Sequence, residues 1–310
     1  MVKATKAQNG RAGRPAGGPA RFIVLAGART GSNMLVQALD SSPHMRCFGE
    51  VFNAALDHIS YGVDGYDNFN ARDRSLRDRD AVAFLRKRVF KRPPAGVRAV
   101  GFKLLYAQDA GFADLLDHLT ADEGLRVLHL RRRNLLRTLV SWKIANGTGL
   151  WVQNGASPLD DAFSLTNARR AARHPLRAAA ALRRRLRLRA SSTNERPQAT
   201  LSRDECMTLF GYVQRQEARY DMLFAGHPKR TLYYEDIVAA PEQELGVVQE
   251  FLAVTPQPLT VTARRQNPEP LRDLLANYDE LRAAFRATPY APFFEEREAA
   301  VPQSFAATTS

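Results

Sequence analysis

Short apolar runs alternate along the chain with segments whose apolar residues recur at helical spacing. The apolar runs predict strands at 21–27, 45–50, 98–106, 125–130 and 230–236. The periodic segments predict helices at 32–40, 80–90, 110–119, 134–145, 204–225 and 242–252. Alternation of this kind is typical of an α/β fold, so we expect a central parallel sheet of about five strands flanked by helices.

Two segments depart from this alternation. Residues 1–20 are rich in Gly, Pro, Ala, Lys and Arg without an apolar period, which predicts a disordered basic leader outside the fold. Between residues 147 and 203 the pattern lapses again, over a length that is unusual for a plain connection in a compact domain. We therefore predict a single domain over 21–310 with an inserted lid at about 147–203.

Composition and charge narrow the class of protein. The chain has 310 residues, of which 45% are hydrophobic, and its two cysteines, Cys47 and Cys206, are too few for a disulfide scaffold. No apolar stretch is long enough to span a bilayer, and residues 1–20 lack the apolar core of a secretory signal, so we expect a cytoplasmic protein. The net charge of +13 comes from four basic residues in the leader and nine arginines between Arg169 and Arg189. Positive and negative charges cancel in the remaining residues, so any general attraction to polyanions would reside in those two segments.

The turn after the first predicted strand has the features of a phosphate site. Backbone N–H groups converge where a helix begins, and Gly31 lets the backbone approach an anion. Side-chain donors are added by Arg29, Thr30 and Ser32. Three positions differ from a Walker A motif, which disfavours a nucleoside triphosphatase or kinase. The turn alone is also consistent with a tight connection that has no ligand.

A second basic motif follows the fourth predicted strand. Arg133 begins the turn, and Ser141 lies eight residues later in the next predicted helix. An arginine offers a fixed fork of donors to a dianionic phosphate, and a hydroxyl two helical turns away can close over it. Taken alone, these residues equally fit a solvated helix face. Because ligands bind at the carboxyl ends of parallel strands, two such motifs in this order favour a shared site.

Together the two motifs resemble the 5′-phosphosulfate loop and the 3′-phosphate motif of sulfotransferases. Segments 232–254 and 264–281 are also similar to the late strand, helix and C-terminal segment of bacterial and carbohydrate-type members. The resemblance covers about 22–294 apart from the variable middle. It implies a P-loop-like sulfotransferase fold that uses the sulfuryl donor PAPS, releases PAP, and needs no metal.

The resemblance also implies roles for individual residues. Arg29 contacts the bridging oxygen as PAP departs, and Lys103 in the third strand helps to hold the sulfuryl group. The 5′-phosphate is bound by Thr30, Gly31, Ser32 and Asn33. The 3′-phosphate is bound by Arg133 and Ser141, and basic residues of the C-terminal segment, Arg264 and Arg265, reach the cofactor. A packed lysine at the sheet edge is an alternative reading of Lys103.

A general base is also needed. Phenol and steroid sulfotransferases carry a catalytic histidine at the position of Leu105, so the resemblance shifts the role to Glu50, which matches the glutamate of carbohydrate-type members. Glu50 can abstract a proton if burial raises its pKa toward neutrality. The alternative is a salt bridge to a loop arginine. Other candidate bases are His44, His58 and His129.

We therefore expect transfer of the sulfuryl group from PAPS to a hydroxyl of a carbohydrate, glycolipid or related metabolite. The alternative is a polyanion-binding or membrane-binding protein on an inactive sulfotransferase-like fold. It would use the segment from Arg169 to Arg189 for an acidic or membrane-surface partner, without a specific nucleic acid. The two readings are compatible, because a basic segment can also recruit an acidic acceptor to an enzyme at the membrane surface.

Overall fold

The computed structural model describes residues 18–53, 69–106, 108–112, 114–148, 198–261 and 266–295. These residues fall into two compact units, which are described separately. The sheet unit takes the described residues of Met1–Ala26, Leu39–Arg131 and Ala218–Leu259. The helical unit takes those of Gly27–Ala38, Arg132–Glu217 and Thr260–Ser310.

The sheet unit contains a five-stranded sheet in the order β2-β3-β1-β4-β5. Its strands are β1 (Ala20–Ala26), β2 (Met45–Phe48), β3 (Ala99–Leu105), β4 (Arg126–Arg131) and β5 (Lys229–Tyr233). All neighbouring strands are parallel, and Ala26 is in register with Leu105 and with Leu130. The carboxyl ends of the three central strands therefore meet at one edge, which confirms the predicted α/β sheet.

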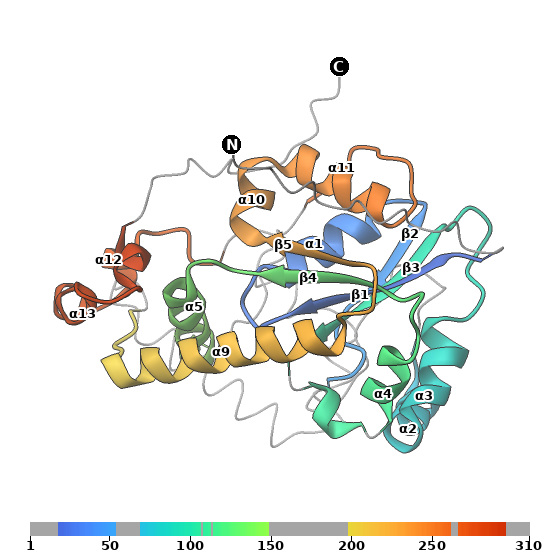
Figure 1. The fold of residues 1–310 in the computed structure, drawn as a ribbon, viewed down its shortest axis with the longest axis horizontal. Coiled ribbons are helices and arrows are strands. Elements are labelled where there is room, and N and C mark those ends of the chain that lie inside the picture. Colours follow the sequence, from blue (N-terminus) through green and yellow to red (C-terminus); the bar gives the residue numbers. More distant parts are fainter. Residues whose placement is uncertain are drawn as a thin grey trace, which may run out of the picture. The chain divides into compact units, whose positions relative to one another are not determined.

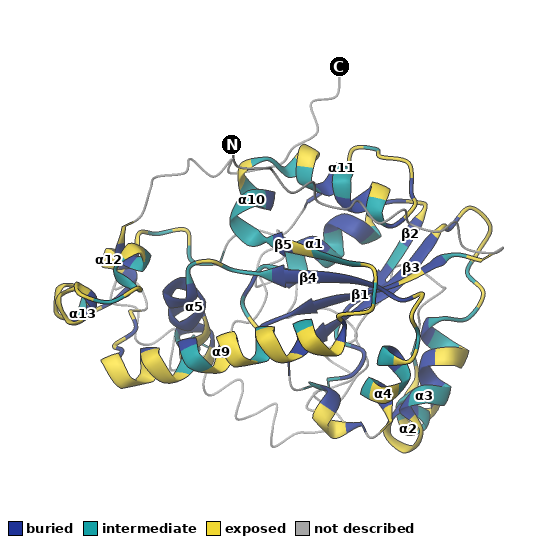
Figure 2. Cartoon of the chain, viewed as in Figure 1, coloured by how far each residue is buried: buried dark blue, intermediate teal, exposed yellow. Residues whose placement is uncertain are grey.

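Helices cover the sheet within this unit. They are α2 (Ala71–Arg79), α3 (Ala81–Phe84), the π-helix η1 (Leu85–Val89), the 3-10 helix η2 (Gln108–Gly111), α4 (Leu115–Thr120), α10 (Tyr234–Ala239) and α11 (Pro241–Phe251). Figure 1 shows α10 and α11 on one side of the strands and α3 and α4 on the other. Burial on both faces of the sheet explains why β1 and β3 are nearly continuous apolar runs (Figure 2).

The helical unit contains the start of α1 (Ser32–Asp40), α5 (Leu135–Thr148), most of α9 (Arg203–Leu223), α12 (Leu271–Leu274), α13 (Tyr278–Phe285) and the 3-10 helix η3 (Ala291–Phe294). Its core is aromatic: the ring of Phe210 lies 4.8 Å from that of Tyr290 and 5.3 Å from that of Phe293. Helix α9 is amphipathic: its buried residues lie along one face, and the residues between them are exposed (Figure 2).

Two predicted elements differ from the structure, and one helix was not predicted. The strand expected at 230–236 ends at Tyr233, because two carboxylates in the next turn, Glu235 and Asp236, favour the helix N-terminus of α10. The helix expected at 110–119 begins only at Leu115, after η2. Helix α2 was not predicted, since Leu76 is the only large apolar residue in its ARDRSLRDR sequence; a capping box between Asn70 and Asp73 begins it.

Several predictions fall outside the described residues. These are most of the leader, the arginines from Arg169 to Arg189, and nearly all of the lid expected at 147–203. The single-domain boundary and the arginine segment therefore remain predictions. Within the described part of the chain, no helix is both long enough and apolar enough to cross a bilayer.

Candidate functional site

The turn predicted to bind a phosphate joins β1 to α1 in the helical unit. Arg29 and Gly31 both have positive φ angles, 65° and 88°, before the helix begins at Ser32. Positive φ in a residue other than glycine is uncommon and clusters at binding sites. The Thr30 hydroxyl donates to the carbonyl of Gly27 at 2.8 Å, so its proton maintains the turn. Backbone N–H groups at the start of α1 and the Ser32 hydroxyl supply the donors that an anion would find here.

The side chain of Arg29 joins this turn to the second predicted motif. Its Nε and NH2 atoms donate to Ser141 Oγ at 3.0 and 2.9 Å, and NH2 also contacts Gln266 Oε1. Ser141 is buried on α5, and burial lowers the pKa of Arg29. The structure therefore brings together, within one unit, two motifs that are more than one hundred residues apart.

The remaining arginines of the second motif have different environments. Arg132 donates to the carbonyl of Arg29 at 3.0 Å and so supports the first turn. Arg133 is exposed at the start of this loop. The Asn134 side chain accepts from the backbone N–H of Arg137 at 3.0 Å and so caps α5.

The C-terminal segment contributes residues that sequence reasoning missed. Asn267 Nδ2 donates to Ser141 Oγ at 3.3 Å, while the buried Arg137 donates to the carbonyl of Glu269 at 2.6 Å. Within the part of the chain that the structure describes, the buried Nε2 of Gln266 has no hydrogen-bond acceptor. A buried donor beside two arginine-bearing turns fits an anionic ligand. The predicted Arg264 and Arg265 precede these amides but lie outside the described residues.

Glu50 and Lys103 form an ion pair in the sheet unit. Glu50 follows β2, Lys103 lies in β3, and their Oε1 and Nζ atoms are 2.8 Å apart. Glu50 Oε2 also accepts from Asn53 Nδ2 at 2.6 Å and from Gln108 Nε2 at 2.9 Å. The side chain of Lys103 is 3% exposed and that of Glu50 is 21% exposed. The expected partner of Glu50 in an ion pair, a loop arginine, is thus replaced by the other predicted site residue.

The pKa of Glu50 is lowered from its ordinary value. Burial raises this pKa, but the Lys103 charge and hydrogen bonds from Lys103, Asn53 and Gln108 together outweigh burial. The condition under which burial would bring Glu50 toward neutrality is therefore not met. Glu50 is an ionised carboxylate with one face directed at a buried ammonium group.

Two of the three alternative histidine bases, His44 and His129, have structural partners. His129 is fully buried in β4, with Nε2 at 2.7 Å from the Tyr106 hydroxyl and Nδ1 at 3.1 Å from Asp221. Burial lowers its pKa to about 4, with the Arg131 charge acting in the same direction. His44 directly precedes β2, at the amino ends of the strands, and its Nδ1 lies 3.0 Å from the Gly96 carbonyl. His58 lies outside the described residues.

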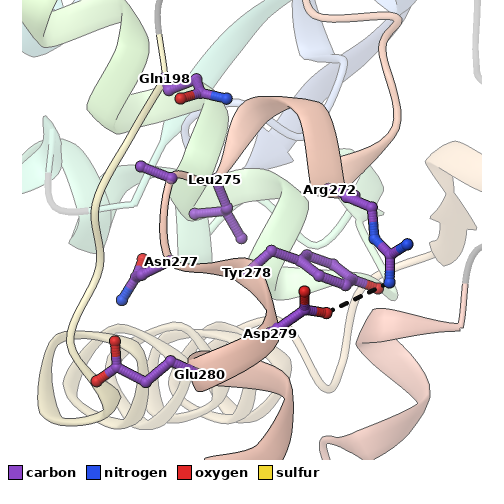
Figure 3. A pocket seen from close by; sticks show the side chains of 8 residues that line it. Gln198, Arg272, Leu275, Asn277, Tyr278, Asp279 and Glu280 are labelled. Atoms are coloured by element: carbon purple, nitrogen blue, oxygen red, sulfur yellow. Dashed lines mark hydrogen bonds and ion pairs between the residues drawn. The ribbon is translucent and has the colours of Figure 1, made fainter.

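A separate open pocket of about 450 Å³ lies around α12 and α13 and contains none of the predicted site residues (Figure 3). Arg272 lines this pocket, 3.3 Å from Asp279 and over the ring of Tyr278. Among the residues that the structure describes, no group of three or more His, Cys, Asp or Glu side chains could hold a metal ion.

A parallel sheet with a glycine-containing strand-to-helix turn and a second basic loop defines an α/β protein with a P-loop-like arrangement. No family model matches the chain. It is 29% identical to Nodulation protein H of Rhizobium tropici over 291 residues, covering 92% of this chain and 97% of that protein. Nodulation protein H of Rhizobium meliloti strain 1021 is 27% identical over 284 residues, covering 89% of this chain and 96% of that protein.

A crystal structure of a sulfotransferase from Alicyclobacillus acidocaldarius superposes with a TM-score of 0.42 and 18% identity, covering 89% of this chain and 94% of that chain. An overlap at this TM-score adds no weight to the assignment. The nearly full-length similarity to the nodulation proteins, together with the parallel sheet, supports the resemblance to sulfotransferases that the two motifs predict.

Proposed function

We propose that this protein is a sulfotransferase that moves the sulfuryl group of PAPS to a hydroxyl of a carbohydrate, glycolipid or related metabolite. The observation that carries the proposal is the contact between Arg29 and Ser141. A donor with phosphates at two ends requires the 5′-phosphate turn and the 3′-phosphate motif to lie within reach of one molecule. Their direct hydrogen bonds meet that requirement within one unit.

The donor set of the helical unit fits a nucleotide with two anionic groups. It offers the Arg29 and Arg133 guanidinium groups, backbone N–H groups at the start of α1, and the buried Nε2 of Gln266. PAPS would supply the transferable sulfuryl group and a stable phosphate leaving group. An anionic acceptor adds charge attraction to the hydrogen bonds of a guanidinium group, so an anion can displace the neutral oxygens that Arg29 now contacts.

The Glu50 and Lys103 pair supports a role in the transfer step. Lys103 carries a buried positive charge suited to oxygens that gain negative charge. Glu50 is ionised and can accept the proton of the acceptor hydroxyl. A glutamate in this role, with Leu105 where other sulfotransferases have a histidine, favours the carbohydrate-type reaction and is the reason for proposing a sugar or glycolipid acceptor.

Thermal denaturation with PAP, 5′-AMP and no nucleotide tests the donor assignment. At a concentration one hundred times the dissociation constant, a ligand stabilises the folded state by about 2.7 kcal/mol, which corresponds to a rise of several degrees in melting temperature. We expect PAP to raise the melting temperature much more than 5′-AMP does. Equal effects of the two nucleotides, or none, would contradict the proposal.

Transfer itself is tested with PAPS labelled in its sulfuryl group. The labelled donor is incubated with the full chain and separate pools of oligosaccharides, glycolipids and phenols. We expect label in the carbohydrate pools and, as a control, none with Lys103→Met. Label found only in the phenol pool would retain the sulfotransferase assignment and overturn the proposed acceptor class.

A further inference from the structure

Gln108 lies between β3 and the turn that carries Glu50, and two partners fix the direction of its amide. Its Oε1 accepts from the backbone N–H of Leu105 at 3.0 Å, and its Nε2 donates to Glu50 Oε2 at 2.9 Å. A backbone N–H can only donate and an ionised carboxylate can only accept, so both contacts require the same amide orientation. The Gln108 NH2 group is therefore directed at Glu50.

The two oxygens of Glu50 are occupied to different extents. Oε2 accepts from both Asn53 and Gln108, whereas Oε1 is paired with Lys103 Nζ. An ionised carboxylate has about four lone-pair positions, two on each oxygen. Within the described residues, Oε2 is therefore saturated, and Oε1 can accept one more hydrogen bond beside the lysine.

The backbone that carries Glu50 is already anchored, which leaves rotation of the side chain as its main freedom. The backbone N–H of Asn53 donates to the carbonyl of Glu50 at 3.1 Å. The buried guanidinium of Arg77 donates to the carbonyls of Val51 and Asn53 at 3.2 and 3.4 Å. None of these three backbone contacts determines which carboxylate oxygen faces Lys103.

Building on the proposed function, we propose that Gln108 is a positioning residue that orients Glu50 so that Oε1, beside Lys103, receives the acceptor hydroxyl. Gln108 lies in η2 and is itself held by the N–H of Leu105 at the end of β3, so it links the carboxylate to the strand that carries Lys103. Without this donor, Oε2 loses one of its two partners and the carboxylate can rotate. Both changes affect the transfer step and leave the nucleotide-binding residues in place.

The first test follows the Glu50 carboxyl group directly and needs no enzyme activity. Full-length protein labelled with ¹³C at the glutamate side-chain carboxyl is titrated by NMR, and the Glu50 signal is assigned by its loss in Glu50→Gln. Removing a donor to the ionised form in Gln108→Met should move the Glu50 midpoint upward. Gln257→Met is the matched control, because Gln257 is also half-buried in the sheet unit but donates to Ser42.

An unchanged Glu50 midpoint in a folded Gln108→Met protein would overturn the inference, as would an equal shift in Gln257→Met. If Gln108→Met does not fold, Gln108→Asn takes its place, since it keeps the amide but is one methylene too short to reach both partners. Melting temperatures of all variants establish that they are folded.

The second test separates positioning from binding. In Gln108→Met we expect kcat to fall by about tenfold or more, as for loss of a hydrogen bond to a charged group, with KM for PAPS changed less than about twofold. The acidic limb of the pH–rate profile should move to higher pH. Wild-type kcat and pH dependence would overturn the inference. If the wild-type protein transfers no sulfuryl group, the proposed function fails, while the NMR titration still decides whether Gln108 holds Glu50.

Discussion

The ion pair between Glu50 and Lys103 makes a quantitative prediction about stability that is independent of catalysis. Three variants are required: Glu50→Gln, Lys103→Met and the double variant. Glu50→Gln leaves a lysine that is 3% exposed without its counter-charge. Lys103→Met leaves a carboxylate that keeps two amide donors, from Asn53 and Gln108. The two single variants therefore should not cost the same free energy.

The magnitudes follow from burial. Breaking a buried ion pair by removing one partner costs about 3–5 kcal/mol, and the 21% exposure of Glu50 places this pair near the lower end. We expect about 3 kcal/mol for Glu50→Gln. For Lys103→Met, where the remaining charge is partly solvated and hydrogen-bonded, we expect about 1–2 kcal/mol. The double variant should be less destabilised than the sum of the two by about 1–3 kcal/mol.

Urea denaturation at neutral pH, with linear extrapolation to water, measures the free energy of unfolding of the wild type and the three variants. The pH dependence gives an independent check of the sign. Because the folded-state pKa of Glu50 lies below the ordinary value of 4.5, its contribution is fully present above that value. It is lost as the pH falls through the lowered folded-state pKa. The stability gap between wild type and Glu50→Gln should therefore be constant at neutral pH and close below about pH 4.5.

Additive effects would refute this reasoning. If the double variant lost the sum of the single losses within about 0.5 kcal/mol, Glu50 and Lys103 would not interact in the folded protein. A gap that widened on acidification would show that the pKa of Glu50 is raised in the folded state.

Three further outcomes follow from the same structure. Glu50→Gln should abolish transfer while PAP affinity measured by calorimetry stays nearly unchanged; normal turnover would remove Glu50 from the reaction. Arg133→Ala should weaken binding of PAP by about 10-fold to 100-fold and that of 5′-AMP much less, whereas equal losses would show that Arg133 does not bind the 3′-phosphate. Gly101→Ala should cost about 1–3 kcal/mol in urea denaturation, because the added Cβ would lie 2.4 Å from the ring of Phe22; wild-type stability would contradict this close approach.

The sheet could be predicted from the sequence because each strand is a short apolar run that can be recognised on its own. β1 and β3 are nearly continuous apolar runs, and the helices between them have their own period, so the α/β order could be predicted residue by residue. The end of β5 was not predictable from the apolar pattern, since Tyr233 and Tyr234 look alike but belong to a strand and a helix. The strand ends there because the carboxylates of Glu235 and Asp236 favour the first turn of helix α10.

The sequence pointed to Arg29, Glu50 and Lys103 as candidate site residues but not to the partners that the structure gives them, and their roles remain predictions. Glu50 and Lys103 were predicted separately, whereas the parallel register of Phe48 with Phe102 brings their segments side by side. The amides that complete the network, such as Gln108 and Gln266, belong to no motif. Their roles depend on contacts across 58 and 237 positions in the chain, which no local pattern records.

The lowered pKa of Glu50 also determines how such a base can act. A carboxylate held in its ionised form is a weak base toward a free alcohol, so it accepts the proton only as the hydroxyl oxygen bonds to sulfur and becomes acidic. Ionisation of Glu50 is then complete well below neutral pH, and kcat/KM should stay constant between pH 8 and pH 6 on this account. A histidine base with an ordinary pKa of about 6.5 would make kcat/KM fall over that interval. A rate that declines through this range would therefore identify a base other than Glu50.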